Sequence, residues 1–337
     1  MKLAELLEKT EYTVVSGNVD VEVKELQYDS RKVTHGDVFV CISGAVVDGH
    51  DFITDVIAKG AAAVIVERDT QGIETADAVI IRTPDTRLAL AYMSAAFFDY
   101  PAEKLFTIGI TGTKGKTTTT FMVRDILEAC NIKTGLIGTI ETIIGDTHIP
   151  SANTTPESYM VQKYFRDMAD AGCRCVVMEV SSQALMLHRT AGIMFDIGVF
   201  TNLEPDHIGE NEHKDFADYM HCKSLLFQQC RHGIFNGDSE HLQGILQGHT
   251  CTVETFGYGA ENDLIAQKVE LKKEHGALGV KYHVGGSMDF DVEVNVPGKF
   301  SVYNSLTAIA ICHHFGVSVE AVSYTHLRAH ETPEHLV

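Results

Sequence analysis

The chain has 337 residues, and its 27 Lys and Arg against 46 Asp and Glu give a formal net charge of −19. This length suffices for two or three domains with a sizeable core, and the 45% hydrophobic and 22% charged residues exclude wholesale disorder. The acidic balance argues against nucleic-acid binding, which needs clustered Lys and Arg, but it permits one phosphorylated small ligand.

The N-terminal part of the chain alternates between helical and strand-like runs. Residues 1–9 place acids among apolar positions, which predicts an amphipathic helix and differs from the uninterrupted apolar segment of a signal peptide. Thr86 is expected to cap a helix that ends at Asp99. Buried strands are expected at 36–42, 61–66 and 78–81, with a helix between the first two. We place a domain boundary near residue 100.

The eight cysteines fall singly inside apolar segments. The tightest pair, Cys173 and Cys175, has one residue between its members, so it cannot form a CxxC redox or zinc motif. Buried free thiols are typical of a reducing compartment, and no run approaches the ~18 apolar residues of a membrane span. We therefore expect a cytoplasmic protein without membrane insertion.

From Leu105 onward, short apolar strands alternate with helical segments. One strand is expected to begin near Leu105, and further strands are expected at 175–180 and 197–201. This alternation predicts an α/β fold with a mostly parallel sheet covered on both faces. Alternation with period two over 280–296 predicts a small antiparallel section, followed by a helix over 301–315.

The segment 323–337 differs from the rest of the chain. It holds His326, His330 and His335 and shows no sustained apolar periodicity. Neither the spacing nor a cysteine partner supports a metal site. We expect a frayed or non-native tail.

The strongest local motif is a glycine-bearing turn between a strand and a helix, at 109–118. Glycines let backbone N–H groups curl around phosphate oxygens, and a helix N-terminus adds partial positive charge. Lys116 would reach the β- and γ-phosphates of a nucleotide, and the Thr117 hydroxyl would bind Mg²⁺. Ile110 departs from the strict GxxxxGK[ST] pattern, so a turn that binds nothing is the alternative. The flanking strand and helix favour nucleotide binding.

Polar residues follow the next two expected strands, at the carboxyl edge where open α/β sheets bind ligands. Glu179 ends one strand, and Asn202, Asp206 and His207 follow the other. Because a buried acid is costly unless it is paired, a Mg²⁺ partner fits Glu179, and an exposed strand-end glutamate is the alternative. For His207 by itself, a structural role is favoured over that of a ligand.

Five motifs in one order resemble the Mur ligases, and among them the MurE type. They are YDSR with GDVFV (28–40), GTKGKTT (112–118), NTTP (153–156), EVSSQAL (179–185) and FTNLEPDH (200–207). The resemblance covers residues 1 to about 322. It implies a UDP-sugar-binding domain at 1–100 and a P-loop-type ATP-binding domain at 101–322. The C-terminal ligase domain of that family is expected to be absent, with the atypical tail at 323–337 in its place.

The resemblance further implies an ATP- and Mg²⁺-dependent ligase of peptidoglycan precursor synthesis. Such an enzyme activates the D-Glu carboxylate of UDP-N-acetylmuramoyl-L-Ala-D-Glu as an acyl phosphate and joins it to a diamino acid, meso-diaminopimelate or L-lysine. We lean towards diaminopimelate and expect a monomer. Because phosphoryl transfer needs both walls of its site, we expect this chain to be inactive or very weak by itself.

Individual roles also follow from the resemblance. The expected catalytic residues are Lys116, His207 and Lys223. The expected ATP contacts are Gly112, Thr113, Lys114, Gly115, Lys116, Thr117, Thr118 and Asn304. The expected Mg²⁺ ligands are Thr117, Glu179, His207 and Lys223, the last as a carbamate. The expected substrate contacts are Ser30, Thr154, Thr155, Ser181 and Arg189. Without the resemblance, Lys223 would be read as a solvated helix lysine and Asn304 as a helix cap or surface residue.

Other classes remain open. Cyanophycin synthetase and folylpolyglutamate synthetase belong to the same superfamily, but the segment 28–39 argues against them, and 179–185 argues against MurF. Leu187 stands where some MurE-type sequences have Gln, and Lys114 replaces a frequent Asn. A non-catalytic nucleotide-binding module or a simple P-loop NTPase would share the loop but ignore a UDP-muramoyl-dipeptide.

Overall fold

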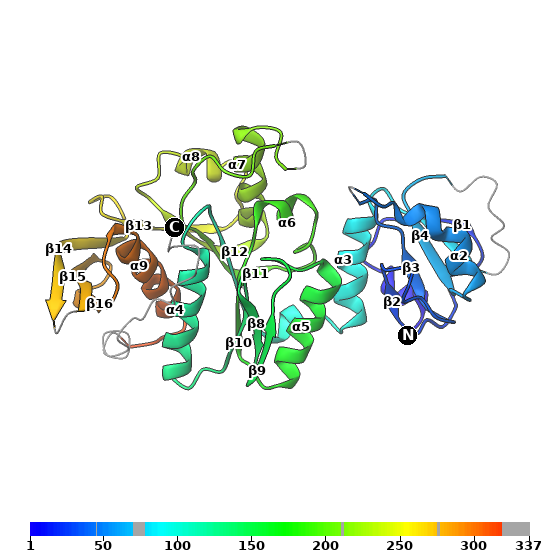
Figure 1. Ribbon diagram of the computed structural model, residues 1–337, viewed down its shortest axis with the longest axis horizontal. Coiled ribbons are helices and arrows are strands. Elements are labelled where there is room, and N and C mark those ends of the chain that lie inside the picture. The colour runs from blue at the N-terminus through cyan, green and yellow to red at the C-terminus, as the bar shows by residue number, and fades with distance from the viewer. Residues whose placement is uncertain (45, 70–77, 210–211, 275–276, 319–337) are drawn as a thin grey trace. The chain divides into compact units, whose positions relative to one another are not determined.

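The computed structural model of the protein describes residues 1–44, 46–69, 78–209, 212–274 and 277–318. These residues form two compact units, each with its own sheet (Figure 1). Unit 1 comprises Met1–Pro101, Glu157–Lys163 and Leu187–Gly192, and unit 2 comprises Ala102–Pro156, Tyr164–Met186 and the chain from Ile193 onward. The tail predicted at 323–337 lies outside the described residues.

Unit 1 is built on a five-stranded sheet in the order β1-β5-β4-β3-β2. The strands are β1 (Thr13–Ser16), β2 (Leu26–Gln27), β3 (Val38–Val40), β4 (Ala63–Val66) and β5 (Val79–Arg82). β1 pairs antiparallel with β5, and the other pairs are parallel. Alternate side chains of β4 enter two separate cores, Ala63 and Ile65 in one and Val64 and Val66 in the other. Both faces of the sheet are therefore buried, as in other parallel sheets.

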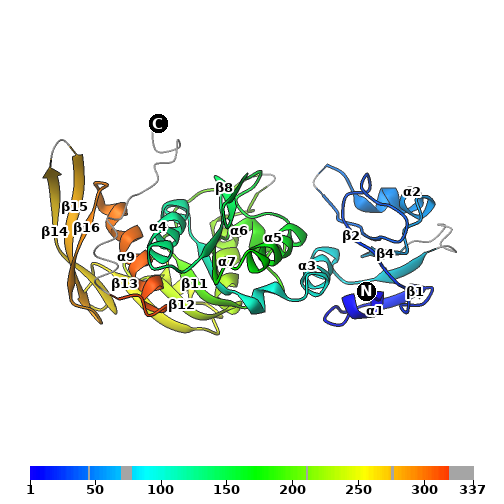
Figure 2. The same ribbon diagram turned by 90° about the horizontal axis from the view of Figure 1, so that it is seen from below.

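Helices cover each of these faces (Figure 2). α1 (Leu3–Leu6) and α3 (Thr86–Phe97) supply one core, and α2 (Ile53–Ala58), preceded by a 3₁₀ turn at Gly49–Phe52, supplies the other. The three strands predicted here are confirmed as β3, β4 and β5. The predicted helix over 1–9 is too long, because only four residues of it are helical.

The predicted cap of α3 is wrong by one residue. Asp85 has extended backbone dihedrals, and its carboxylate accepts the N–H of Leu88 at 2.9 Å, so Asp85 is the cap. Thr86 instead lies inside the helix and donates its hydroxyl to Glu67 at 2.9 Å. The acidic side chain one position earlier accepts the N–H of Leu88, and both the N–H and the hydroxyl of Thr86 bind Glu67.

Unit 2 contains an eleven-stranded sheet in the order β16-β15-β14-β13-β12-β11-β6-β10-β7-β8-β9. Its strands are β6 (Phe106–Thr111), β7 (Thr134–Ile137), β8 (Glu141–Ile144), β9 (Thr147–Pro150), β10 (Cys175–Glu179), β11 (Phe195–Phe200), β12 (Cys230–Asn236), β13 (Thr252–Gly257), β14 (Leu264–Glu274), β15 (Ala277–Gly286) and β16 (Phe290–Val294). The strands from β14 to β7 in that order are mutually parallel. Antiparallel pairs extend both edges, so the predicted mostly parallel fold with an antiparallel section is confirmed.

The remaining helices are α4 (Lys116–Ala129), α5 (Ser158–Asp170), α6 (Ser182–Met186), α7 (Phe216–Ser224), α8 (Leu242–Ile245) and α9 (Lys299–His313), with 3₁₀ turns at Pro101–Lys104 and Leu225–Gln228. In the described part of the chain, none of the helices has the length and apolarity that a bilayer crossing needs. All eight cysteines are free thiols, and all but Cys130 are buried, as predicted.

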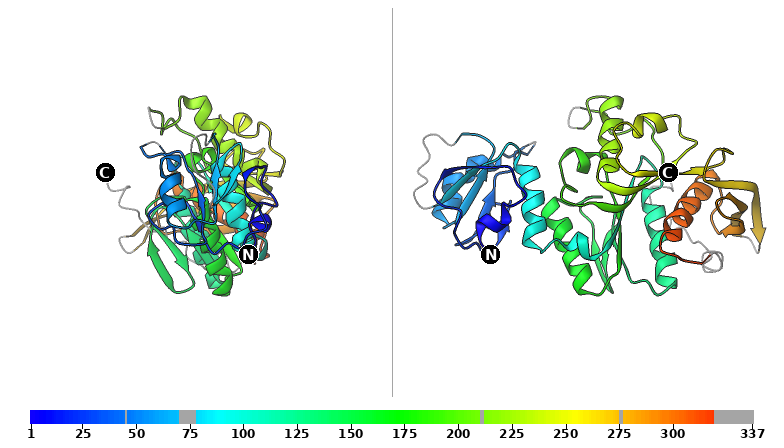
Figure 3. Two further views of the ribbon diagram at one scale, coloured as in Figure 1. Left: turned by 90° about the vertical axis from the view of Figure 1, so that its right-hand side faces the viewer. Right: turned by 180° about the vertical axis from the view of Figure 1, so that it is seen from behind.

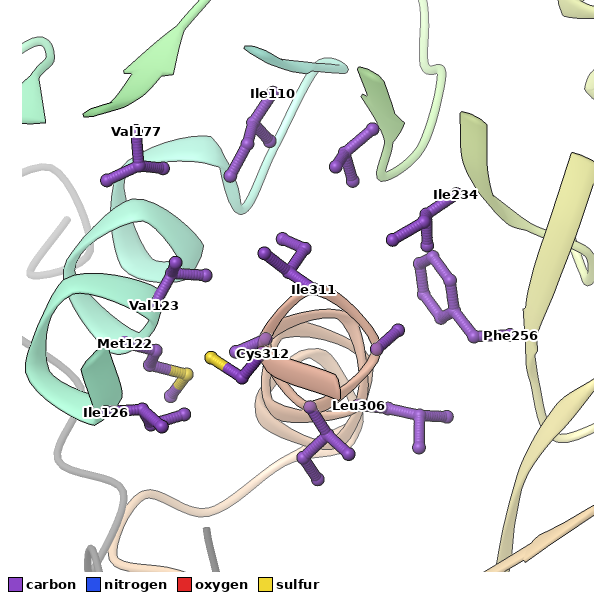
Figure 4. Packing of buried hydrophobic residues seen from close by; sticks show 14 of the residues in the cluster. Ile110, Met122, Val123, Ile126, Val177, Ile234, Phe256, Leu306, Ile311 and Cys312 are labelled. Atoms are coloured by element: carbon purple, nitrogen blue, oxygen red, sulfur yellow. The ribbon is translucent and has the colours of Figure 1, made fainter. Parts of the chain in front are cut away.

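The main core of unit 2 lies between the sheet and the adjacent helices α4 and α9 (Figures 1 and 3). Figure 4 shows Met122 and Val123 of α4 and Ile311 of α9 packed below Ile110 and Val177 of the sheet. These side chains are at most 1% exposed. On the other face, a side chain at Gly135 would collide with Met168, and one at Gly109 would lie in tight contact with Phe195 and Leu226. The sheet is thus covered on both faces, and this rigid base carries the loop that follows β6.

Candidate functional site

The turn between β6 and α4 has a backbone that only glycine adopts easily. Gly112 has φ +146°, and Gly115, which caps α4, has φ +85°. A Cβ atom on Gly112 would collide with Thr201 Oγ1, and a Cβ atom on Gly115 would collide with Asn304 Oδ1. Asn304 is 8% exposed, so it is neither a surface residue nor, at this position inside α9, a helix cap. The turn therefore fits closely against the chain around it.

The two residues that follow β11, Thr201 and Asn202, hold the loop in place through hydrogen bonds. Asn202 accepts the N–H of Lys114 with Oδ1 and donates Nδ2–H to the Lys114 carbonyl, both at 2.8 Å. Thr201 donates its hydroxyl to the same carbonyl at 2.8 Å, and the N–H of Thr113 reaches the Asn202 carbonyl at 3.0 Å. The sequence placed Asn202 after a strand but gave no hint that it holds the loop. These bonds use the N–H groups of Thr113 and Lys114 and fix the backbone of the turn.

Lys116, the first residue of α4, keeps its charge on the loop. Its ammonium donates to the carbonyls of Gly112 and Thr113, each at 2.9 Å. Thr117 follows it at the helix start, and Thr118 is buried inside the helix. A lysine and a helix N-terminus beside a glycine-bearing turn place positive charge where phosphate oxygens could bind.

Glu179, the last residue of β10, is 0% exposed, so the alternative of an exposed strand-end acid is wrong. Its Oε2 accepts hydroxyl hydrogens from Thr117 at 3.0 Å and Thr139 at 3.1 Å, and its Oε1 accepts the N–H of Thr139 at 2.9 Å. Burial raises the pKa of the carboxyl, although the Thr139 N–H and the charge of Lys116 act in the opposite direction. A buried carboxylate beside two hydroxyls is an oxygen ligand set that suits Mg²⁺.

Lys223 in α7 is buried, at 2% exposure, so the alternative of a solvated helix lysine is wrong. Its Nζ donates to the Gly112 carbonyl at 2.9 Å and lies 4.4 Å from the centre of the Tyr219 ring. Burial lowers the pKa of this amine well below its usual value, and the charge of Lys116 lowers it further. The site therefore favours a neutral amine, which is nucleophilic.

His207 lies in the loop after β11, with φ +53° and an exposed side chain. Its Nδ1 is 3.2 Å from Glu212 Oε1, and its Nε2 is 3.7 Å from an Asp206 carboxylate oxygen. Its ring centre is 6.3 Å from that of Tyr219, on which Lys223 also packs. His207 and Lys223 are thus both neighbours of one aromatic ring, beside the phosphate loop.

Three of the predicted substrate residues gather around the end of β10. Thr154 and Thr139 share a hydroxyl–hydroxyl hydrogen bond of 3.0 Å. Thr155 donates its hydroxyl to the Glu179 carbonyl at 2.8 Å and accepts the N–H of Ser181 at 3.1 Å. Thr139, which links this group to Glu179, was missed because β7, the strand that ends two residues before it, was not predicted.

The other two predicted substrate residues belong to unit 1. Arg189 binds Glu157 through Nε at 2.8 Å. Ser30 lines a cavity of about 590 Å³ whose wall also includes the aromatic rings of Tyr28, Phe39 and Phe52 and the charged Asp29, Arg31 and Arg87. Arg31 donates two hydrogen bonds of 2.8 Å to Asp29 and lowers the pKa of that carboxyl to about 2. Aromatic walls with a few charged groups, in a cavity of this size, are typical of a small-molecule site.

Gly115→Ala is expected to destabilise the protein and weaken nucleotide binding. A left-handed φ costs a non-glycine residue about 1–2 kcal/mol, and the Asn304 collision adds to this at residue 115. Gly172→Ala is the matched control, because Gly172 has φ +81° and no heavy atom within 4 Å of the added Cβ. Urea unfolding and ATP calorimetry would measure both variants. If the two variants were equally destabilised and both kept their ATP affinity, the Asn304 side chain would move away from the added Cβ atom at no measurable cost.

Comparison with known proteins adds the following. Residues 110–312 match the family described as Mur ligase middle domain, and residues 22–98 match Mur ligase family, catalytic domain. A UDP-N-acetylmuramoyl-L-alanyl-D-glutamate--2,6-diaminopimelate ligase of Clostridium perfringens is 41% identical over 327 residues, 96% of this chain and 66% of the relative. A Clostridium acetobutylicum ligase of the same name is 38% identical over 322 residues, 96% of this chain and 65% of the relative. A solved structure of an equally named ligase superposes with a TM-score of 0.80 at 22% identity, over 97% of this chain and 66% of that one.

Proposed function

The chain belongs to the Mur ligase family, and from that premise we propose that it serves an ATP-dependent amide ligation in peptidoglycan precursor synthesis. In the proposed reaction, a D-Glu carboxylate oxygen of UDP-N-acetylmuramoyl-L-Ala-D-Glu attacks the γ-phosphorus of ATP and ADP leaves. The amine of a diamino acid then attacks the acyl carbon, and phosphate leaves. The names of the relatives support 2,6-diaminopimelate over L-lysine as that amino acid. The chain spans 66% and 65% of the lengths of these relatives.

The observation that carries this proposal is the buried Glu179 carboxylate bonded to Thr117 beside the lysine-bearing loop. We assign the phosphates of ATP to the loop 112–118, in which Asn202 already holds the N–H groups of Thr113 and Lys114, and to the ammonium of Lys116, with Asn304 beside the nucleotide. Thr117 and Glu179 would hold Mg²⁺, which offsets phosphate charge when it is bound. Burying the charge of this carboxylate, whose pKa is raised, costs folding free energy, and a bound cation at this position would offset that cost.

Lys223 and His207 are assigned to a second Mg²⁺. The buried amine of Lys223 would attack the carbon of CO₂ and lose a proton, which leaves a carbamate anion with oxygen ligands. Its lowered pKa supports this assignment, because only the unprotonated amine can form that bond. His207 would need to exchange its contact with Glu212 for the metal.

For the peptide part of the substrate we propose Thr154, Thr155, Ser181 and Arg189, and for its uridine part the cavity of unit 1 at Ser30. The guanidinium of Arg189 suits a carboxylate or phosphate oxygen. We further propose that the protein acts in the cytoplasm as a monomer. A plain P-loop NTPase, the competing class, would have no use for the cavity of unit 1.

Calorimetry with UDP-N-acetylmuramoyl-L-Ala-D-Glu separates these two classes. The ligase proposal predicts binding of one equivalent, weakened about 10- to 100-fold by Arg31→Ala in the cavity wall, since a hydrogen bond from a charged group contributes about 1.5–3 kcal/mol. Arg82→Ala, on the exposed end of β5 in the same unit, should bind as the unchanged protein does. ATP binding without any heat from the UDP-sugar peptide would favour the plain NTPase.

A further inference from the structure

Three side chains of unit 2 converge away from the phosphate loop. They are His232 of β12, Glu254 of β13 and His314, which follows the last residue of α9. The Nε2 atoms of His232 and His314 lie 2.9 Å and 2.7 Å from the same Glu254 Oε2. The imidazole rings are 4.3 Å apart between centroids, and one ligand atom from each side chain lies within 4.8 Å of the others.

The strand register separates this cluster from the nucleotide site. His232 pairs with Ile197 of β11, which pairs with Ile108 of β6, three residues before that strand ends. Along α9, His314 follows Asn304 by ten residues, which at a rise of 1.5 Å per residue is about 15 Å. The residues assigned above to Mg²⁺ and ATP are therefore not part of this cluster.

The orientation and the solvent exposure of the three side chains both suit metal ligands. The second ring nitrogen of His232, Nδ1, is hydrogen-bonded to the Thr252 hydroxyl, which fixes the ring and leaves Nε2 directed at Glu254. The exposed fractions of the His232, Glu254 and His314 side chains are 25%, 16% and 28%, so an ion from solvent can reach them. The same Glu254 oxygen faces a ring nitrogen of each histidine, so all three side chains direct a ligand atom at one point.

We propose that His232, Glu254 and His314 form a binding site for a divalent transition-metal ion, with Zn²⁺ as the best fit. Two imidazole nitrogens and one carboxylate oxygen are a common three-residue zinc set, and water takes the fourth position. Mg²⁺ and Ca²⁺ prefer sets made of oxygen and would bind here poorly. A bound ion would tie β12 and β13 to the end of α9, the helix that places Asn304 against Gly115.

The test uses the full chain after treatment with a chelator. Zn²⁺ should raise its melting temperature, Mg²⁺ should not, and Co²⁺ should give the visible absorption of a tetrahedral site. His314→Ala, at a partly exposed helix end, should weaken Zn²⁺ binding more than about 100-fold, beyond the usual loss for an outer-shell partner. Glu254→Gln, which keeps the side-chain shape, should also abolish the Co²⁺ spectrum.

His283→Ala is the matched control, because His283 lies in β15, two strands from β13 in the sheet, beside the exposed acids Asp289 and Asp291. It should leave both signals unchanged. A Zn²⁺ effect that persists in His314→Ala would assign the binding to other histidines of the chain and overturn the proposal. The absence of any Zn²⁺ effect on the unchanged protein would mean a hydrogen-bonded triad only, and would overturn it as well.

Discussion

Replacing Lys116 with alanine is expected to weaken ATP binding by about 10- to 100-fold. The ammonium is held on the loop by the carbonyls of Gly112 and Thr113, so it meets phosphate oxygens without a costly rearrangement. A charge-assisted hydrogen bond contributes about 1.5–3 kcal/mol, and about 3 kcal/mol corresponds to a hundredfold change in affinity. Calorimetric titration of the chain with ATP and Mg²⁺ would measure this loss.

Lys114 supplies the matched control in the same loop. Its Nζ pairs with Glu204 at 2.6 Å, and both side chains are exposed. Because exposed ion pairs contribute about 0–1 kcal/mol, Lys114→Ala should change ATP affinity by no more than about fivefold. Binding of the UDP-sugar peptide should survive both substitutions, because we assign its uridine part to the cavity of unit 1 and its peptide part to residues outside the phosphate loop. If Lys116→Ala weakened the two ligands equally, the assignment of separate binding sites would be wrong.

The fold could be predicted from the sequence where the signal is local. β3, β4, β10 and β11 are short apolar runs between polar segments, and each was found within a few residues. The order of the strands could not be predicted, because β6 lies between β10 and β11 through pairings of residues that are 69 and 89 positions apart in the chain. The hairpin of β8 and β9 was overlooked, although its Gly145-Asp146 turn is a hairpin signal.

In the candidate site, too, the residues set by local sequence could be predicted and those brought together by the fold could not. The glycines of 112–118 and the position of Glu179 at a strand end are visible in the sequence, because they follow from local strand–turn–helix order. The burial of Lys223 is not visible, since its helix reads as polar and only the fold brings it to the Gly112 carbonyl. Family resemblance singled it out where spacing could not. Thr139 and Asn202 went without a role because their partners are 40 and 88 residues away in the chain.

Glu179→Gln is expected to stabilise the ligand-free protein and to remove the Mg²⁺-dependent part of its nucleotide affinity. Folding raises the pKa of this carboxyl above its ordinary value of 4.5, chiefly through burial. Below the ordinary value the carboxyl is protonated in both the folded and the unfolded protein. As the pH rises from there through the raised pKa, the unfolded protein loses this proton more readily, so the stability of the folded protein falls. Glutamine carries no charge to bury. Its oxygen can still accept the Thr139 N–H, and its amide can donate to the hydroxyls of Thr117 and Thr139.

Melting temperatures between about pH 5 and about pH 8 should diverge, with the variant above the unchanged protein at the higher end. ATP affinity should fall about 10- to 100-fold with Mg²⁺ and little without it, since a charged ligand to the cation is lost. Glu204→Gln controls for charge near the loop, because Glu204 is exposed and pairs with Lys114. Lower stability of Glu179→Gln at every pH would mean that the carboxylate's three hydrogen bonds outweigh its burial. Unchanged Mg²⁺ dependence would mean that this acid does not face the metal, and its burial would then need another cause.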